Sequence, residues 1–263
     1  MIKWMLSLAM LTIFFFPILS TAREKDKDLV ALWLFDEGRG DKTEDATGNK
    51  NNGTLFNCKW VKGKFGSALE FNGKDSCVTV PDSKSLTFEN NQISITAWLT
   101  QDGAGKEDWH TVVCKGNMVG GSENYAVFTN SKLKYICTTL TLGGGDRWWT
   151  ISGNGSLDID KKWHHFATTY NGKDVKYYLN GKEVAVSSKA SKKLVPTEKD
   201  LTIGCRVPDG IQWHGKLDEI GFFQKVLNPK EIQGIMNDGY EKFLNVDMGG
   251  KLPIKWGELK RKS

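Results

Sequence analysis

The chain has 263 residues, of which 39% are hydrophobic and 25% charged, and it contains ten tryptophans. Its formal net charge of +5 is small, and the two signs are interspersed along the sequence. Such a balance gives no argument for binding to nucleic acid or to a membrane surface, so neither is expected as a partner.

The N-terminal residues have the layout of a secretory signal peptide. Lys3 precedes an apolar run over residues 4–19, and Ser20, Thr21 and Ala22 supply small residues for cleavage after Ala22. An uncleaved anchor is the alternative, but the run is marginal for a span of about 20 residues and Pro17 interrupts it. We therefore expect a signal peptide over 1–22, a charged leader over 23–28, secretion, and no membrane span after signal removal.

Short alternating segments separated by turn residues follow through most of the chain. Residues 93–99 alternate cleanly over seven positions, which indicates a strand with one buried face. Asn180-Gly181 joins two such segments and favours a type I′ hairpin turn. Further strands are expected at 31–35, 68–71, 76–80, 111–114, 125–128, 133–140, 164–170, 175–179, 183–186, 201–204 and 217–223.

A single helix is expected late in the chain, near 228–238. Asn228 can cap it, Pro229 suits its first position, Glu231 completes a capping box, and Gly239 can end it. Many short strands with one late helix are typical of a β-sandwich or jelly roll.

Seven segments in this order resemble the laminin-G-like jelly-roll domains of the concanavalin A-like lectin/glucanase superfamily. The resemblance covers residues 29–240 and implies an all-β, two-sheet antiparallel jelly-roll sandwich with one short C-terminal helix. Residues 241–263 lie beyond it as a C-terminal extension. The segments are WLFDEG (33–38), DATGNKNNG (45–53), GSALEFNG (66–73), ISITAW (93–98), WHHFATTY (163–170), YLNGK (178–182) and GKLDEI (215–220).

Catalysis is not expected from this sequence. Glycoside hydrolysis needs two carboxylates across a cleft, and the superfamily's glucanases carry Glu-x-Asp-x-x-Glu on one strand, which is not found here. Asp218 and Glu219 are adjacent, so strand alternation should point them to opposite faces. A divergent glycan-active enzyme is the weaker alternative.

Calcium is considered because oxygen-bearing side chains crowd a loop near the start. Asp45, Asn49 and Asn52 stand close together in the sequence, and Ca²⁺ takes six to eight oxygen ligands. The resemblance implies that the first and last strands are neighbours, which would bring Asp218 to the same site. Asp36 and Glu37 are further candidate ligands, since one loop alone cannot fill the coordination shell. The alternative is that these Asp and Asn side chains only build turns.

Tryptophans near polar, glycine-rich stretches carry the binding hypothesis. Their flat faces can stack on sugar rings or anchor a protein, and an arginine adds a planar donor fork. We expect a secreted binding module for a glycan, or alternatively for an extracellular or cell-envelope protein. The predicted ligand-binding residues are Trp109, Arg147, Trp148, Trp149 and Trp213, although one of Trp148 and Trp149 is core if the pair lies on a strand.

Five cysteines leave at least one thiol outside any disulfide within the chain. Secretion permits disulfide bonds. Cys114 and Cys137 lie in strand-like segments, and they either pair across neighbouring strands or act as small buried hydrophobic residues.

Overall fold

The structure is a computed structural model of the whole chain. It describes residues 26–88, 91–103, 108–116, 124–143, 146–153, 155, 161–189, 192–206 and 210–246. The expected signal peptide over 1–22, residues 23–25 of the expected leader over 23–28, and residues 247–263 lie outside these ranges. In the described part, no helix is both long enough and apolar enough to cross a membrane.

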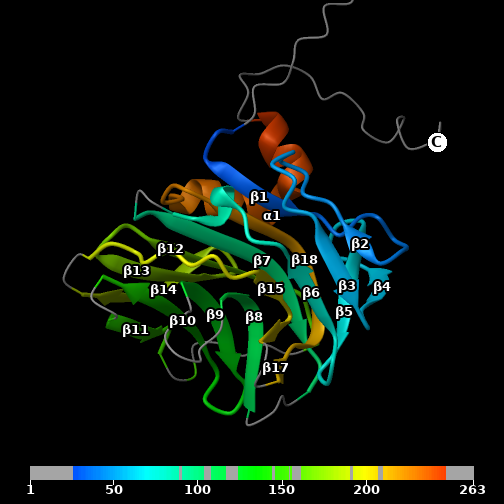
Figure 1. Cartoon of the computed structure of the whole chain (residues 1–263), viewed down its shortest axis with the longest axis horizontal. Coiled ribbons are helices and arrows are strands. Elements are labelled where there is room, and N and C mark those ends of the chain that lie inside the picture. Colours follow the sequence, from blue (N-terminus) through cyan, green and yellow to red (C-terminus); the bar gives the residue numbers. More distant parts are fainter. Residues whose placement is uncertain are drawn as a thin grey trace, which may run out of the picture.

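Two large antiparallel sheets form the body of the molecule (Figure 1). The first sheet runs in the order β14 (Lys182–Ser188), β13 (Asp174–Leu179), β12 (His164–Tyr170), β7 (Ile93–Gln101), β18 (His214–Phe223), β5 (Ser67–Asn72) and β4 (Lys59–Lys62), and β1 (Leu29–Trp33) also pairs with β18. The second sheet runs β11 (Asp146–Ile151), β10 (Tyr135–Leu142), β9 (Tyr125–Asn130), β8 (Trp109–Lys115), β15 (Leu201–Ile203), β6 (Cys77–Val80), β3 (Gly53–Phe56) and β2 (Lys42–Thr43). This arrangement confirms the predicted fold class.

Two short elements complete the strand-rich part. A two-stranded sheet joins β16 (Cys205–Arg206) to β17 (Ile211–Gln212), and a 3₁₀ turn, η1, covers Lys84–Leu86. The Asn180-Gly181 hairpin between β13 and β14 forms as expected, because both residues adopt positive φ angles of 48° and 75°.

The main core lies between the two sheets. The Phe222 ring of the first sheet meets the Tyr125 ring of the second, with 5.9 Å between centroids. The Tyr177 hydroxyl of β13 crosses the same interface and donates to the Thr150 carbonyl of β11 at 2.7 Å. Apolar contacts and buried hydrogen bonds therefore hold the sheets in one relative position.

The helix α1 (Pro229–Val246) packs on the outer face of the first sheet, beside β1 in Figure 1. Its predicted capping box forms, because Asn228 accepts from the Glu231 N–H and the Glu231 carboxylate accepts from the Asn228 N–H. Gly239 breaks the helical geometry with φ 69° and ψ 169°, but a helical segment resumes and extends to Val246. The helix is therefore longer than predicted and kinked where it was expected to end.

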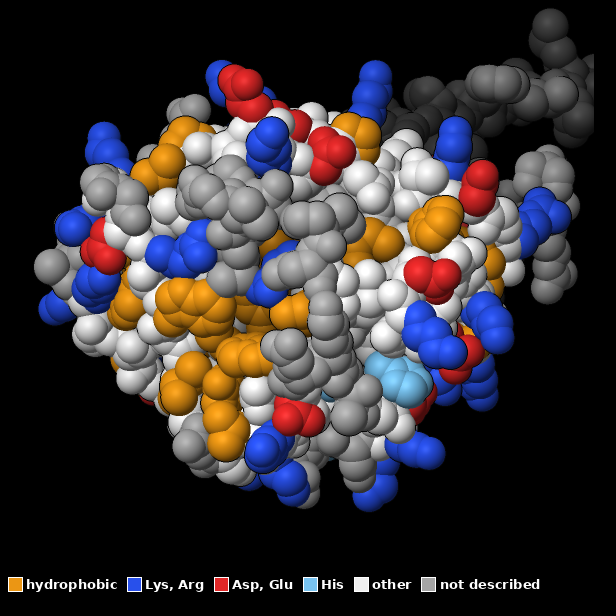
Figure 2. Space-filling model, turned by 60° about the horizontal axis from the view of Figure 1, so that its bottom comes forward, with side chains coloured by type: hydrophobic (Ala, Val, Ile, Leu, Met, Phe, Trp, Pro, Cys, Tyr) orange, Lys and Arg blue, Asp and Glu red, His pale blue; other side chains and the backbone are white. Residues whose placement is uncertain are grey.

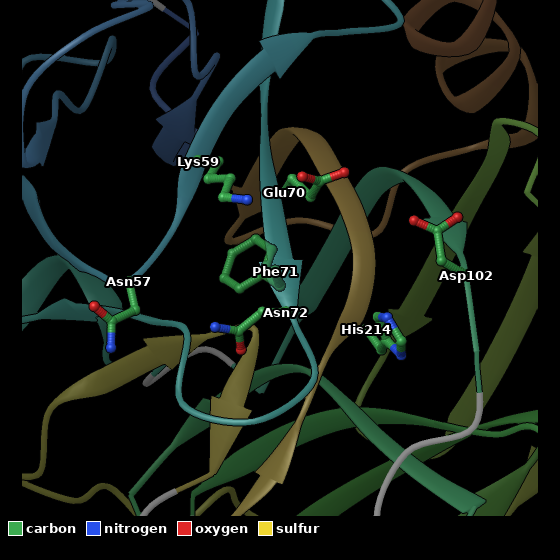
Figure 3. A pocket seen from close by; sticks show the side chains of 7 residues that line it. All are labelled: Asn57, Lys59, Glu70, Phe71, Asn72, Asp102 and His214. Atoms are coloured by element: carbon green, nitrogen blue, oxygen red, sulfur yellow. The ribbon is translucent and has the colours of Figure 1, made fainter.

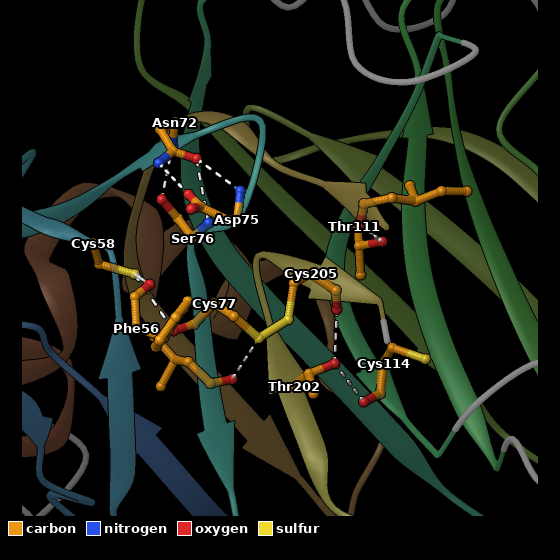
Figure 4. Close-up of a disulfide and its surroundings, with 12 residues drawn as sticks. Phe56, Cys58, Asn72, Asp75, Ser76, Cys77, Thr111, Cys114, Thr202 and Cys205 are labelled. Carbon is orange, nitrogen blue, oxygen red and sulfur yellow. Dashed lines mark hydrogen bonds between the residues drawn. A yellow bond between two sulfur atoms is a disulfide. The ribbon is translucent and has the colours of Figure 1, made fainter. Parts of the chain in front are cut away.

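One disulfide bond joins Cys77 of β6 to Cys205 of β16 (Figure 4). Cys58, Cys114 and Cys137 remain thiols. Cys114 and Cys137 are buried on β8 and β10, and β9 runs between these two strands. Of the two alternatives for this pair, the small buried hydrophobic residue is the one that the structure supports.

Candidate functional site

The outer face of the second sheet carries a cluster of aromatic side chains, which we call the aromatic platform: Trp109, Phe128, Tyr135 and Trp149. The residues come from four neighbouring strands, β8 to β11. Successive side chains of a strand point to opposite faces of the sheet. On β9, Tyr125 and Val127 face the core, so Phe128 faces outward, where it lies with Trp109 and Tyr135.

Trp109 is the hub of the platform. Its ring lies edge-on or tilted to three others, with centroid distances of 6.4 Å to Phe128, 5.9 Å to Tyr135 and 6.3 Å to Trp149. Trp149 runs nearly parallel to Phe128, at an angle of 18° and a distance of 6.4 Å. These separations lie in the range of direct aromatic contact, so the rings hold one another in fixed orientations.

The platform is open to solvent at one end. The Trp149 side chain is 44% exposed and Ile151, two residues along β11, is 42% exposed, whereas Phe128, which stacks against Trp149, is buried. Figure 2 shows a hydrophobic patch in orange on the face that comes forward when the bottom of Figure 1 is turned toward the viewer. A large exposed ring fixed on a sheet offers a flat apolar surface that requires no loop to order.

Two arginines accompany the platform. Arg147 lies two residues before Trp149 on β11, opposite Thr141 of β10, and is half-buried. The Arg206 guanidinium lies over the Phe128 ring, 5.1 Å from its centroid, as in a cation–π contact. Planar donor groups therefore flank the aromatic rings.

The structure thus unites Trp109, Arg147 and Trp149 and separates them from Trp148. The residues 146–151 form strand β11 rather than a loop, so Trp148 points into the core and Trp149 points out. Trp148 packs edge-on against Tyr170 at 6.2 Å. Trp148 is therefore a core residue, and its prediction as a ligand-binding residue is wrong.

Trp213 is also corrected. Its side chain is fully buried, with 0% exposure, and its ring meets the His110 ring edge-on at 5.7 Å. The backbone N–H of Trp213 donates to the Gly204 carbonyl at 2.7 Å, which fixes the chain between β17 and β18. The flanking polar and glycine residues suggested an exposed loop, but the ring fills the core and cannot reach a ligand.

Three of the predicted calcium ligands, Asp45, Asn49 and Asn52, lie in one turn, where hydrogen bonds within the protein engage their side chains. Asp45 is buried, and its two carboxylate oxygens accept hydrogen bonds from the backbone of Leu32, Thr47 and Asn51 and from the side chains of Thr47 and Asn51. Asn52 accepts from the Asp45 N–H and Asn49 donates to the Val30 carbonyl. These side chains build a turn against β1, as the alternative interpretation stated.

Asp218 lies elsewhere, against the connection between β4 and β5. Its carboxylate accepts from the backbone N–H groups of Lys64 and Phe65 at 2.8 and 3.1 Å. In the described ranges, no group of three or more His, Cys, Asp or Glu side chains is arranged to hold a metal ion. Asp45, Asn49 and Asn52 are engaged within their own turn and Asp218 lies against a different segment, so a calcium site built from these four residues stays a prediction.

A β-bulge changes the expected geometry of Asp218 and Glu219. The register between β18 and β7 shifts between Asp218 and Gly221, and Glu219 has a positive φ of 46°. The Glu219 carboxylate accepts from the Tyr240 N–H at 3.1 Å, next to the kink of α1. Both carboxylates therefore accept hydrogen bonds from backbone N–H groups on the outer side of the first sheet. The expectation that they point to opposite faces is not met, because the bulge interrupts the alternation.

These two acids should make the stability of the protein depend on pH. Burial raises the pKa of Asp218 from 3.8 to about 7 and that of Glu219 from 4.5 to about 8, and repulsion by Asp36 adds to both shifts. The folded state then holds protons that the unfolded state releases, so this stabilisation is present at low pH and is lost as pH rises to about 8. Burial also lowers the pKa of His110 to about 4 and of His165 to about 3. These two groups have the opposite effect, because below pH 6.5 the unfolded state binds protons that the folded state does not, so their contribution to stability rises with pH up to about 6.5.

We expect the free energy of unfolding to be nearly level from about pH 4.5 to 6.5 and then to fall by about 2 to 3 kcal/mol by pH 8, at about 1.4 kcal/mol per pH unit and group. Urea unfolding at half-unit pH steps, with a chelator present, measures this. Asp218→Asn with Glu219→Gln should remove the fall above pH 6.5. A fall of unchanged size in that double variant would contradict the assignment.

A polar cavity of about 290 Å³ lies where β5 ends and β18 begins (Figure 3). Two of the side-chain amides that line the cavity are already hydrogen-bonded within the protein, because Asn57 and Asn72 both donate to the Asp75 carboxylate. Charged side chains of both signs supply most of the remaining lining. The lining residues are Asn57, Lys59, Glu70, Phe71, Asn72, Asp102 and His214. The platform presents the larger aromatic surface and is the candidate binding site.

Two antiparallel sheets in this order, with a helix on one outer face, define a jelly-roll β-sandwich. The family model described as the concanavalin A-like lectin/glucanases superfamily matches residues 72–233, more than half of the chain. The chain belongs to this superfamily, as the sequence resemblance indicated. No sequence among curated proteins matches it.

Solved structures share the fold at low sequence identity. The binding domain of Paraclostridial Mosquitocidal Protein 1 has a TM-score of 0.63 and 19% identity, with 80% of this chain and 52% of that chain covered. Domain 4 of AbnA, a GH43 extracellular arabinanase from Geobacillus stearothermophilus, in complex with arabinotriose, has a TM-score of 0.61 and 19% identity, with 80% and 98% covered. The botulinum neurotoxin serotype D/C binding domain has a TM-score of 0.60 and 14% identity, with 81% and 53% covered. The chain thus spans about half the length of the two toxin binding domains.

Proposed function

We propose that this chain is a secreted, non-catalytic carbohydrate-binding module, and that a sugar ring stacks on the exposed face of Trp149. The observation that carries the proposal is a 44% exposed tryptophan whose ring is held by Trp109 and Phe128 on a rigid sheet. Sugar rings have apolar faces that stack on such a surface, while Arg147 offers donors to their hydroxyl oxygens.

The comparisons support the same direction. Domain 4 of AbnA, a structure in complex with arabinotriose, is covered over 98% of its length by this fold. The Cys77–Cys205 disulfide suits an oxidising, extracytoplasmic compartment. Asp218 and Glu219 bind backbone N–H groups, which is a structural use of the two carboxylates and supports a non-catalytic role.

Trp149→Ala should weaken glycan binding by about 30-fold or more, since truncating a binding hot spot costs about 2 kcal/mol. A panel of arabino-, xylo-, cello- and galacto-oligosaccharides identifies the sugar to titrate by calorimetry. The melting temperature should change less than it would for a core tryptophan, because 44% of the Trp149 side chain is exposed.

Phe56→Ala is the matched control, because Phe56 is a 61% exposed aromatic residue on β3 of the same sheet. It should leave sugar binding unchanged. If no glycan binds and Trp149→Ala instead abolishes binding to an extracellular protein, the alternative function as a protein-interaction or adhesion domain replaces this one.

A further inference from the structure

The orientation of the two tryptophans restricts how a sugar chain can lie on the platform. Trp109 stands at 74° to Trp149, while Trp149 is nearly parallel to the buried Phe128. The platform therefore presents one exposed stacking face with a second ring rising beside it. It is a corner, not a row of parallel rings.

The corner is fixed before any ligand arrives. Trp109 packs edge-on against Phe128 at 89° and against Tyr135 at 72°, and both of these neighbours are buried. Rotating Trp109 into the plane of Trp149 would break both contacts. Three ring contacts hold Trp109 as the side of the corner, so the corner is preorganised.

An extended glycan needs successive stacking faces that lie roughly parallel, since its sugar rings follow one another along the chain. Trp109 and Trp149 cannot serve two successive sugars in this way, because their planes are nearly perpendicular. Their centroids are only 6.3 Å apart, which means that both rings border the same small space.

We infer that the platform recognises a single, chain-terminal sugar residue, which stacks on Trp149 and contacts Trp109 with its edge. This inference rests on the proposed function and specifies its ligand. Arg147, two residues from Trp149 on the same strand, is on the same face of the sheet and offers donors for hydroxyl or carboxylate oxygens of that sugar. The sugars further along the chain project away from the corner.

The test is a titration of the full chain with arabinose, xylose, glucose and galactose and with their oligosaccharides of two to six residues. Tryptophan fluorescence and ligand-observed NMR give the dissociation constants. The affinity for the preferred series should change by less than about threefold from the monosaccharide to the hexasaccharide. A rise of more than about tenfold with chain length overturns the inference while leaving the proposed function intact.

Trp109→Ala separates the two arrangements directly. If both rings contact one residue, this variant weakens the binding of monosaccharide and hexasaccharide by the same factor, about tenfold or more. Trp109→Phe should restore part of that affinity. A loss confined to the longer sugars means that Trp109 contacts a second residue and overturns the inference. If none of these sugars binds, so that Trp149→Ala has no effect in the sugar titrations, the proposed function is overturned as well.

Discussion

Replacing Cys77 and Cys205 together by alanine should lower the free energy of unfolding by about 5 kcal/mol. The disulfide joins residues 128 positions apart, so its removal frees a long loop in the unfolded chain. Cys77 lies on β6, and Cys205 follows β15, which pairs with β6 through Val78 and Ile203. The bond therefore fixes neighbouring strands that already meet in the fold. Urea unfolding of the variant and the wild type measures the difference.

Cys58→Ala is the control for this experiment. The Cys58 thiol donates to the carbonyls of Phe56 and Cys77, so it lies close to the disulfide. Burial raises the pKa of Cys58 from 9.0 to about 12, which keeps it a thiol at neutral pH and slows its attack on the bond. The Cys58 variant should keep the wild-type midpoint and should lose stability on reduction as the wild type does. A loss below about 1 kcal/mol for the double variant would contradict the expected role of the disulfide.

The sheets could be predicted from the sequence because their residues alternate over long stretches. Residues 93–99 place Ile93, Ile95, Ala97 and Leu99 toward the core, and this strand pairs with 164–170 in the centre of the first sheet. Strands β16 and β17 have only two residues each, too few to show a period. The ring of Trp213 is buried by His110, about a hundred positions away, and the polar residues around it gave no sign of this contact.

The candidate site was predicted in part. The segment 146–151 alternates as a strand should, with Trp148 and Thr150 buried and Trp149 and Ile151 exposed. The residue types do not show which face is inward, because Trp149 and Ile151 are both apolar while the polar Thr150 shares the face of Trp148. Phe128 and Tyr135 were missed because their strands look buried from sequence, and only the sheet order brings them beside Trp149. The bulge at Glu219 likewise depends on pairing with β7 and not on local pattern.

Asp45→Ala should lower the free energy of unfolding by at least about 3 kcal/mol, in the presence or absence of calcium. The substitution removes the acceptor of three backbone N–H groups, those of Leu32, Thr47 and Asn51, each buried and each costing about 1 kcal/mol or more when left unsatisfied. The turn that Asp45 organises also places Asn51, whose carbonyl accepts from the buried Trp33 indole at 2.8 Å.

Thermal and urea unfolding with calcium and with a chelator distinguish this role from that of a metal ligand. Glu44→Ala is the matched control, since it removes the same charge from the exposed neighbouring residue and should change stability by less than about 0.5 kcal/mol. Asp45→Asn keeps one acceptor oxygen and should lie between the two. An Asp45→Ala loss that appears only with calcium and disappears with the chelator would restore Asp45 as a ligand, because a bound ion stabilises only the protein that can hold it. If Asp45→Ala lowers the free energy of unfolding equally with calcium and with the chelator, the role of the Asp45 carboxylate is to accept hydrogen bonds from the backbone of β1 and of its own turn.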